Sequence, residues 1–307
     1  MTQTKLATEF DSGDQIRVFP RCAVLLAAYN GERWIIEQIE SILAQQCVDV
    51  SLFISVDLSD DSTLSLCEQI AMSNRNVVVL PYGDRFGGPA PNFFRLVNDV
   101  KIDEFDIFAL ADQDDIWFEH KLNRAWVNIS SGSYDVYSSD VKAVWPDGRS
   151  LNIVKSMPQT EFDYLFEAAG PGCTYVFTNL AFRSLQSFLR MNHIDCCRVQ
   201  LHDWLFYAYC RSTGFSWFID SEVGLYYRQH ERNQVGVNKS FNAYQKRISL
   251  IRSGWYKNQV YLISRLCCPQ MAKKVRSRLF IIFNIFKLRR DFRDRLFLFV
   301  AALLGVY

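Results

Sequence analysis

The sequence predicts an α/β protein whose sheet is mostly parallel, followed by a helical C-terminal region. Short apolar runs alternate with amphipathic stretches between residues 22 and 111, which is the pattern of βαβ units. Each apolar run ends in a loop rich in Asp, Asn or Gly. Residues 241–307 then contain 14 Lys and Arg against 2 Asp and Glu, although the whole chain has a formal net charge of only +1. An acidic body of net charge −11 therefore carries a basic tail of net charge +12.

Length and composition restrict the class of protein. The chain has 307 residues, of which 49% are hydrophobic and 15% aromatic, so it can bury a core and is not expected to be disordered. The nine cysteines include no CxxC pair, which argues against a zinc site and fits reduced thiols in a cytoplasmic protein. The first residues show no basic region followed by an apolar run, so we expect no signal peptide. No stretch reaches about 18 uncharged apolar residues, so we expect no spanning helix. The near-neutral charge argues against a nucleic-acid partner.

The first βαβ unit begins with residues 22–28 (CAVLLAA), a continuous apolar run that predicts a buried strand. An Asn-Gly pair then marks a turn, and apolar side chains at helical spacing predict a helix over residues 32–44. A second strand over residues 50–56 leads through a polar loop into a helix over residues 64–72. The pattern is repeated by a strand over 76–80, a helix over 91–100 and a strand over 106–111.

Beyond residue 120 the pattern is less regular, with short strands and aromatic-rich loops, and the basic tail from residue 241 onward is predicted to be helical. We expect three parts along the chain: a flexible N-terminal arm over residues 1–20, an α/β catalytic domain over 21–240, and a basic amphipathic helical region over 241–307. Parallel sheets bind ligands in the loops beyond the carboxyl ends of their strands. The loops in that position here are residues 29–31, 57–63, 83–91 and 112–115.

The loop after the fourth strand carries three carboxylates within four residues, Asp112, Asp114 and Asp115. Carboxylates this close repel one another, and a bound Mg²⁺ or Mn²⁺ relieves the repulsion. The alternative is an acidic, solvated loop in which Asp115 caps a following helix. The buried strand before the loop favours the metal site.

The loop after the second strand begins with Asp57, in the position where nucleotide-binding folds often place an acid that contacts the ribose or base. The alternative is helix capping by Asp61, Ser62 or Thr63, and both readings can hold at once. In the glycine-rich segment 83–93, the chain can approach an anion closely, although a plain tight turn has the same composition.

Two further clusters lie later in the chain. Asp203 is flanked by His and Trp in an aromatic stretch, so it is a candidate general base, and the alternative is that it caps the helix over residues 204–210. In residues 226–236, Arg228 and Arg232 are candidates to pair with phosphates, and His230 is a candidate metal ligand. The alternative for this segment is an ordinary charged surface loop.

Taken in order, these clusters resemble the family 2 glycosyltransferases, and more narrowly their bacterial rhamnosyltransferase-like branch. The resemblance covers roughly residues 22–236, and its most specific parts are DQDDIW at 112–117 and YRQHxxNxxG at 227–236. It also includes the AYNG segment at 28–31, the loop at 57–63, GGPAPNFF at 87–94, GCT with VF at 172–177, and HDW at 202–204.

The resemblance implies a GT-A fold, a divalent cation (Mg²⁺ or Mn²⁺) and inversion at the anomeric carbon. It implies that Asp203 is the general base and that Asp114, with His230, binds the metal on the diphosphate. Asp57 would contact the nucleotide base, Asp112 the nucleotide or sugar, and Arg228 the diphosphate. The full set of implied donor contacts is Ala28, Tyr29, Asn30, Asp57, Asn92, Asp112, Gln113 and Arg228. One departure is that the loop at 57–63 reads DLSDDST, where the family commonly has a second acid and glycines.

The resemblance further implies transfer of a sugar, L-rhamnose from dTDP-L-rhamnose, to a glycan or lipid-linked acceptor in cell-surface polysaccharide or lipopolysaccharide (O-antigen) synthesis. The alternative is a non-catalytic nucleotide-sugar or glycan-binding protein of the same fold. The presence of both Asp114 and Asp203 argues against that alternative. A nucleotidyltransferase is disfavoured, because the loop after the first strand is not rich in glycine and basic residues.

The basic tail has two possible interpretations. Residues 273–307 interleave Arg and Lys with Leu, Phe and Ile, as do helices that lie in a membrane interface. The alternative is that the apolar face packs on the catalytic domain and the cations face solvent. The uncharged end, Leu296–Tyr307, favours the membrane. We therefore expect a cytoplasmic protein attached peripherally to the inner face of the cytoplasmic membrane.

Overall fold

The structure is a computed structural model that describes residues 19–230 and 253–307. The predicted N-terminal arm lies almost wholly outside the described residues. Arg232, the last part of the YRQHxxNxxG segment and the predicted boundary between residues 240 and 241 also lie outside the described residues.

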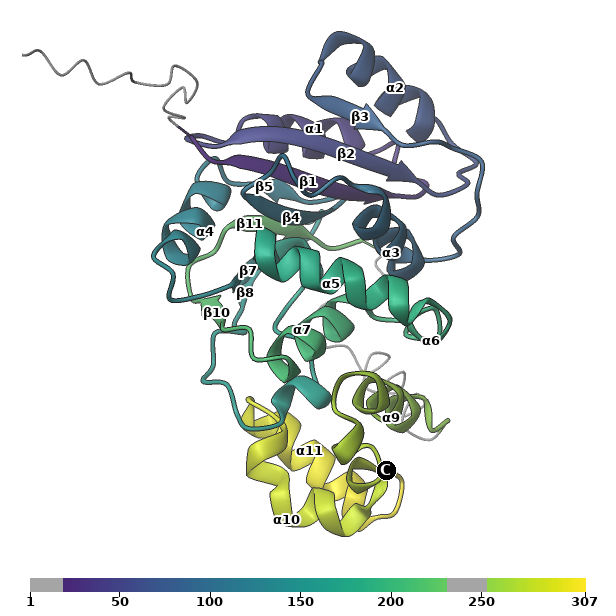
Figure 1. Ribbon diagram of the computed structural model, residues 1–307, viewed down its shortest axis with the longest axis vertical. Helices are drawn as coiled ribbons and strands as arrows, with labels where there is room; N and C mark the ends of the chain where they lie inside the picture. The colour runs from purple at the N-terminus through teal and green to yellow at the C-terminus, as the bar shows by residue number, and fades with distance from the viewer. Residues whose placement is uncertain (1–18, 231–252) are drawn as a thin grey trace, which may run out of the picture.

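A seven-stranded sheet forms the centre of the molecule, in the order β10-β6-β9-β4-β1-β2-β3 (Figure 1). β1 pairs in parallel with β2 and with β4, and β2 pairs in parallel with β3. β9 runs antiparallel to β4 and β6, so the sheet is mixed but mostly parallel, as predicted. The bounds are β1 (Arg21–Ala28), β2 (Asp49–Val56), β3 (Val77–Val79), β4 (Ile107–Asp112), β6 (Val136–Ser139), β9 (Val176–Thr178) and β10 (Trp217–Asp220).

The residues of β1 explain why helices cover both faces of the sheet. Cys22, Val24 and Leu26 belong to one buried cluster, whereas Ala23 and Leu25 belong to another, as expected when alternate side chains point to opposite faces. Helices α1, α2 and α4 cover the first cluster, and α3, α5 and α7 cover the second (Figure 1). The bounds are α1 (Ile35–Leu43), α2 (Thr63–Ser73), α3 (Pro89–Asp99), α4 (Lys121–Ser130), α5 (Asn179–Met191), α6 (His193–Cys196) and α7 (His202–Ser212), with 3₁₀ turns at Asp163–Leu165 and Gly172–Thr174.

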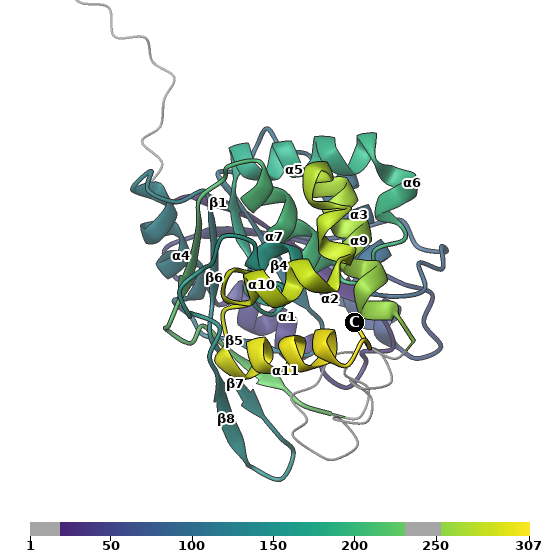
Figure 2. The same cartoon turned by 90° about the horizontal axis from the view of Figure 1, so that it is seen from below.

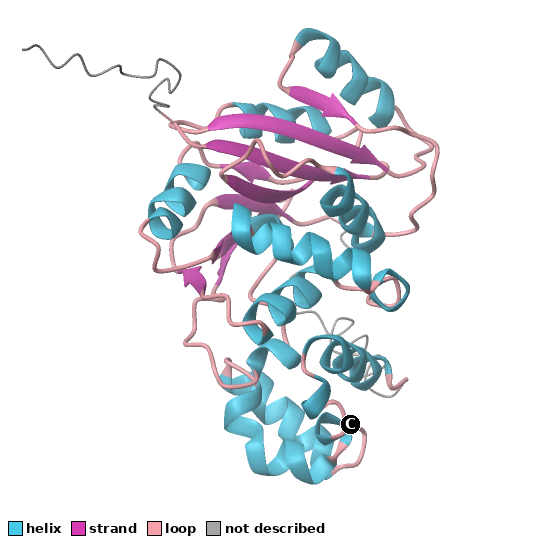
Figure 3. Cartoon of the chain, viewed as in Figure 1, coloured by secondary structure: helices cyan, strands magenta, loops and turns pink. Residues whose placement is uncertain are grey.

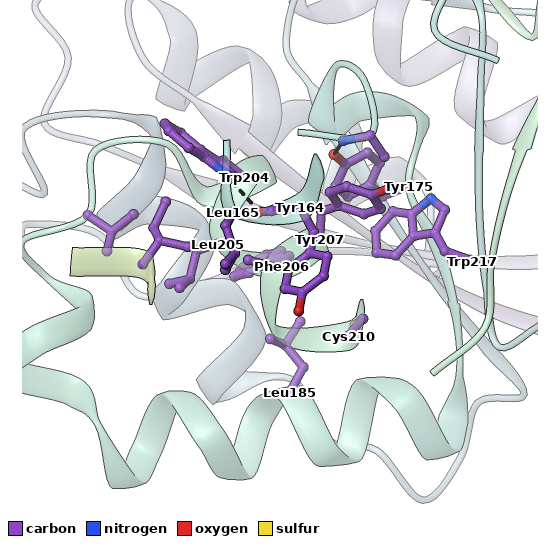
Figure 4. Packing of buried hydrophobic residues seen from close by; sticks show 14 of the residues in the cluster. Tyr164, Leu165, Tyr175, Leu185, Trp204, Leu205, Phe206, Tyr207, Cys210 and Trp217 are labelled. Atoms are coloured by element: carbon purple, nitrogen blue, oxygen red, sulfur yellow. Dashed lines mark hydrogen bonds between the residues drawn. The ribbon is translucent and has the colours of Figure 1, made fainter. Parts of the chain in front are cut away.

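The second buried cluster is dominated by aromatic side chains. Figure 4 shows Tyr207 beside Trp217, with ring centroids 4.9 Å apart, and Trp204 farther along the same cluster. The indole nitrogen of Trp204 donates to the carbonyl oxygen of Tyr164 at 3.0 Å, so its polar atom is satisfied within the core. The start of α7, which carries the candidate base, is therefore set in a rigid part of the molecule.

A smaller sheet, in the order β5-β11-β7-β8, lies beside the main one. Its members are β5 (Ile116–Trp117), β7 (Val141–Val144), β8 (Ser150–Ile153) and β11 (Leu225–Arg228). β11 pairs with β5 antiparallel, with Leu225 opposite Trp117. This pairing brings the late basic segment beside the acidic loop that precedes β5. The interpretation of Asp115 as a helix cap is wrong, because the two-residue strand β5 follows it and α4 begins only at Lys121.

From residue 253 on, the C-terminal region is helical, as expected, and forms the end of the molecule opposite α2 (Figures 1 and 3). Apolar residues of this region, among them Ile263, Ile281 and Leu288, belong to the same buried cluster as α5 and α7. Among the described residues, no helix is both long and apolar enough to cross a membrane. The bounds are α9 (Trp255–Cys267), α10 (Arg278–Leu288) and α11 (Phe292–Leu303), with 3₁₀ turns at Pro269–Met271 and Lys274–Arg276.

Buried polar contacts also attach this region to the α/β domain. Arg290 has a side chain that is only 1% exposed, and it forms an ion pair with Asp163 at 3.0 Å. It also donates to the carbonyl oxygen of Ala169 at 3.3 Å. The interpretation in which the tail packs on the domain is therefore confirmed for these residues, although Arg290 itself is a buried cation and not a solvated one.

Candidate active site

The loops predicted to meet at the carboxyl edge of the sheet do meet there. The side chain of Gln113 pairs with the main chain of Tyr29 in both directions: the amide of Tyr29 donates to Oε1 at 2.7 Å, and Nε2 donates to the carbonyl oxygen at 2.8 Å. Gly31 leaves room for this side chain, because a Cβ atom there would lie 2.2 Å from Gln113 Oε1 and the amide group would have to shift. The loop after β1 is thus held against the loop after β4.

The loop after β1 is also tied to the loop after β2. Asn30 has a φ of 47°, its amide donates to Ser59 Oγ at 3.0 Å, and its Oδ1 accepts the amide of Asp60 at 2.9 Å. Asp61 Oδ1 accepts the amide of Thr63 at 3.0 Å just before α2, whereas the N-cap residue is Ser62 and its side chain makes no capping hydrogen bond. Three loops of the site are therefore joined by hydrogen bonds of their own side chains.

Asp57 is buried at the end of the second strand, and both of its carboxylate oxygens are occupied. Oδ1 accepts the amide of Phe86 at 2.8 Å, and Oδ2 accepts the amide of Gly87 at 2.9 Å. The carboxylate thereby holds the glycine-rich segment in place. Its predicted contact with a nucleotide base stays a prediction.

Two other predicted donor contacts lie inside the protein. Asn92 is 2% exposed, and its Nδ2 donates to the carbonyl oxygen of Ser55 at 3.1 Å, which joins α3 to β2. Ala28 is 1% exposed, and its carbonyl oxygen accepts the amide of Asp57 at 2.8 Å. The geometry gives both residues structural roles, and it lends no support to a direct contact of their side chains with a donor.

The acidic loop after β4 contains crowded, buried carboxylates. Burial raises the pKa of Asp112 to about 7, and the charges of Asp114 and Asp203 add to the rise. Burial also raises the pKa of Asp115 well above its usual range. Carboxylate oxygens of Asp112 and Asp115 and the sulfur of Cys173 all lie within 4.8 Å of one another. A divalent cation near this loop would offset the repulsion, so the residues present fit the expected metal.

The two predicted metal ligands are brought together although they lie 116 positions apart in the chain. His230 Nε2 lies 2.7 Å from Asp114 Oδ2. The imidazole ring also stacks on the indole ring of Trp34, with centroids 4.0 Å apart and an interplanar angle of 14°. Trp34 was not predicted as a site residue, because its place among the apolar residues of the helix predicted over 32–44 predicts only a core contact.

Arg228, at the end of β11, forms an ion pair with Glu37 of α1. The guanidinium group is therefore occupied by a carboxylate of the protein in this structure, and its predicted contact with a diphosphate stays a prediction. Sequence reasoning also missed Glu37. The only signal was its spacing of three residues from Trp34, which places both on one face of the helix predicted over 32–44.

Asp203 lies in the first turn of α7, which begins at His202, with Leu201 at the N-cap position. Its interpretation as the helix N-cap is therefore wrong. Burial raises the pKa of Asp203 to about 6, while a hydrogen bond from the amide of Trp204 at 2.8 Å and the charge of Lys155 oppose the rise. Such a carboxylate is deprotonated at neutral pH and more basic than an exposed one, which suits a general base.

The ring of His202 is held neutral beside Asp203. It stacks on Phe93 with ring centroids 4.0 Å apart, and burial lowers its pKa to about 3. Gly172 lies against both residues, and a Cβ atom there would lie 2.5 Å from His202 Nε2 and 3.4 Å from Asp203 Cβ. A glycine at this position lets the preceding segment approach the start of α7, which fixes the place of Asp203 opposite the acidic loop.

Comparisons with known proteins agree with this geometry. The model of the glycosyltransferase-like family 2 matches residues 20–165. A curated relative, the dTDP-rhamnosyl transferase RfbG of Shigella flexneri, is 39% identical over 289 residues, which cover 92% of this chain and 100% of the relative.

Solved structures share the fold at low sequence identity. The chain resembles S. aureus TarS 1-349 in complex with UDP-GlcNAc, with a TM-score of 0.58, 14% identity, and coverage of 93% of this chain and 80% of that one. It also resembles the mannosyltransferase PcManGT from Pyrobaculum calidifontis in complex with GDP-Man and Mn²⁺, with a TM-score of 0.53, 14% identity, and coverage of 94% and 81%. The expected GT-A fold is confirmed.

Proposed function

The chain belongs to family 2 of the glycosyltransferases, and we propose that it moves L-rhamnose from dTDP-L-rhamnose to a glycan or lipid-linked acceptor, with inversion at the anomeric carbon. The sugar and the nucleotide are inferred from the Shigella flexneri relative, which matches this chain over its full length. The process is the synthesis of cell-surface polysaccharide, such as lipopolysaccharide O-antigen. One observation carries the proposal: a partly buried carboxylate suited to a base, Asp203, lies within electrostatic reach of Asp112 in the acidic loop.

The proposed transfer is a single displacement. The acceptor oxygen forms a bond to the anomeric carbon while the bond from that carbon to the diphosphate breaks, and Asp203 takes the proton of the acceptor hydroxyl. The sugar carbon passes through an oxocarbenium-like state, as in glycoside hydrolysis. Double displacement would require a second carboxylate as the nucleophile. Asp112 and Asp114 are instead assigned to the donor and the metal, so one base with inversion fits the residues best.

Asp114 and His230 are the proposed ligands of the divalent cation, Mg²⁺ or Mn²⁺. Their ligand atoms lie 2.7 Å apart, which is close enough for both to contact one ion. When bound, such an ion supplies positive charge opposite the leaving diphosphate. Mn²⁺ was present in the solved Pyrobaculum mannosyltransferase, which supports the choice of ion by analogy of fold.

The proposed donor contacts lie along the same edge of the sheet. Tyr29 is 45% exposed, so its ring is a candidate for stacking on a nucleotide base. Gln113 holds the main chain of Tyr29 in place for this contact. For Asp57 to bind the base, the amides of Phe86 and Gly87 must share its oxygens or move away.

We also propose that the C-terminal helices lie on an anionic membrane, at the inner face of the cytoplasmic membrane, where a lipid-linked acceptor would be presented. Seen from below, α10 and α11 lie side by side at this end of the molecule (Figure 2). Each carries exposed apolar side chains at helical spacing, and exposed cations accompany them, so the surface matches a bilayer with anionic headgroups. The exposed apolar residues are Leu279, Phe283 and Phe286 of α10 and Phe292, Leu296, Val300 and Leu303 of α11, and the exposed cations include Lys273, Lys274, Arg276, Arg278 and Arg293.

The membrane contact is tested by sedimentation with vesicles that contain phosphatidylglycerol. Replacing Phe283 and Phe286 together by Ser should weaken binding by at least about tenfold, because each buried Phe contributes roughly 1.5–3 kcal/mol. Met72→Ser on α2 is the matched control, since Met72 is 86% exposed at the other end of the molecule. Equal binding of the double variant and the wild type would show that this face is not the membrane contact.

The donor is tested by thermal shift with dTDP, UDP and GDP, each with and without Mn²⁺, followed by turnover of dTDP-L-rhamnose. We expect the largest shift with dTDP and Mn²⁺, since a ligand at a hundredfold its Kd stabilises the native state by about 2.7 kcal/mol. A larger shift with UDP would retain the transferase and exclude the rhamnosyl donor. Binding of dTDP-L-rhamnose without turnover on any membrane fraction would favour the non-catalytic alternative.

A further inference from the structure

The end of β11 and the start of α1 touch at two points. The ring of His230 stacks on the ring of Trp34, and Arg228 forms an ion pair with Glu37. Arg228 is the last residue of β11 and His230 follows it by two positions, whereas Trp34 is the N-cap residue of α1 and Glu37 lies in its first turn. The two contacts therefore join neighbouring residues of the same two segments.

The stacked ring restricts how His230 can turn. An imidazole lying 4.0 Å from an indole and nearly parallel to it can swing away only by giving up the ring contact. While the stack persists, Nε2 stays 2.7 Å from Asp114 Oδ2. The side chains of His230 and Asp114 are only 11% and 12% exposed, so water has little access to either partner.

Trp34 is itself fixed to the loop after β1. Its amide donates to the carbonyl oxygen of Gly31 at 2.9 Å, within the turn that leads into α1. The guanidinium carbon of Arg33 lies 5.6 Å from the centroid of the indole ring, which adds a cation–π contact. Trp34 thus belongs to the loop that contains Tyr29, and its indole ring stacks on the ring of His230, which comes from a much later segment of the chain.

We propose that Trp34 is a positioning residue for the metal-binding pair, holding His230 in the orientation in which it shares a divalent cation with Asp114. Glu37 secures the same strand end through Arg228. This inference rests on the proposed metal role of Asp114 and His230. Trp34 acts through His230, as do other groups that orient metal ligands from behind, and loss of such a group typically weakens metal affinity by about 10–100-fold.

The test is a titration of Mn²⁺ into the full-length protein in the presence of dTDP, followed by electron paramagnetic resonance of the remaining aqueous ion. Trp34→Leu should raise the Kd for Mn²⁺ by about tenfold or more. Trp34→Phe, which keeps an aromatic face under the imidazole, should recover most of that loss. Ile36→Ala is the matched control, because this neighbour on α1 is exposed and should leave the Kd unchanged.

A double-mutant cycle separates positioning from a general effect on α1. In a His230→Ala background, Trp34→Leu should cause little further loss of Mn²⁺ affinity, since the ring it positions is absent. An undiminished loss in that background would mean that Trp34 acts elsewhere. Glu37→Gln should raise the Kd by less than about fivefold, as expected for a partly exposed pair, and Glu40→Gln one turn along should not change it.

Two outcomes distinguish this inference from the proposed function. If wild-type protein with dTDP binds no Mn²⁺, the metal role of Asp114 and His230 fails and the positioning role fails with it. If wild-type protein binds Mn²⁺ and folded Trp34→Leu binds it equally well, only the positioning role of Trp34 is wrong. Circular dichroism of each variant verifies that it is folded before the titration.

Discussion

Two groups of buried acids in this molecule are built in opposite ways. The carboxylate of Asp163, between the α/β domain and the C-terminal helices, accepts a hydrogen bond from Tyr207 at 2.7 Å and pairs with Arg290 at 3.0 Å and Arg211 at 3.4 Å. Burial raises the pKa of Asp163, and the two arginines oppose the rise.

The acids of the site have other acids as neighbours. The pKa of Asp112 is raised first by burial and then by the charges of Asp114 and Asp203. The chain therefore balances the charge of its structural acid with its own arginines, whereas the site gathers negative charge that a ligand can balance. Like charges crowded together are typical of a functional site, whereas a buried charge paired with the opposite charge is typical of a structural contact.

The largest effect that separates the two groups is expected for Asp203→Asn. Removing the base should lower kcat by about 10²–10⁴-fold, while the Kd for dTDP with Mn²⁺ and the melting temperature stay close to wild type. The measurements are single-turnover transfer and calorimetric donor binding. Asp103→Asn is the control, since the Asp103 side chain is 84% exposed and pairs with an Arg183 side chain that is 50% exposed. A loss of donor binding as large as the loss of kcat would contradict the role of Asp203 as base.

The next effect concerns the structural acid. Arg290→Met leaves Asp163 buried without its main cation, so the free energy of unfolding should fall by about 3–5 kcal/mol. Lys287→Met is the control, because the pair of Lys287 with Glu161 is about half exposed and should contribute less than about 1 kcal/mol. Denaturation in urea measures both variants. A small loss for Arg290→Met would mean that the C-terminal helices are held mainly by apolar contacts.

A smaller effect is expected from pH. The pKa of Asp203 is raised to about 6, mainly by burial, and a general base acts in its deprotonated form. The value of kcat/KM at saturating metal should therefore fall about tenfold for each pH unit below about 6 and level off above it. A pH series with a constant ionic strength measures this limb. A profile that stays level down to about pH 4.5 would contradict the assignment.

The smallest effect is the most direct test of the comparison. At pH 8 without metal, Asp112→Asn should stabilise the protein by about 0.5–2 kcal/mol, because it removes one of several repelling charges. Asp163→Asn should instead destabilise it, since Arg290 remains charged and loses its partner. Urea midpoints of the two variants should thus shift in opposite directions. Shifts of the same sign would mean that the two groups of acids are not built differently.

The sequence alone predicted the half of the molecule whose pattern is local. The strands over 22–28 and 50–56 and the helix between them follow from apolar periodicity, and the structure moves their ends by only a few residues. The helix predicted over 32–44 begins at Ile35, because Gly31 and Trp34 first form a turn. The resemblance to a known family identified Asp114 and His230, which the structure places in contact.

The contacts that were missed join distant segments through short elements. β5 has two residues, Ile116–Trp117, which is too short for a periodic pattern, yet it carries the pairing that brings β11 to the acidic loop. The pair of Arg290 and Asp163 spans 127 positions and involves ordinary charged residues. Local sequence therefore indicated which residues are candidates for catalysis or binding, but not which residue each of them contacts.

The reciprocal pairing of Gln113 and Tyr29 has a consequence for how donor preference changes between relatives. An amide side chain that both donates and accepts stands in for a peptide unit, so the two loops it joins are fixed to each other as strands are. The segment around Gly83, Gly87 and Gly88 borders open space at each glycine and is anchored through the carboxylate of Asp57. Evolution can remodel that segment for a new nucleotide or sugar while the two loops joined by Gln113 and Tyr29 stay unchanged.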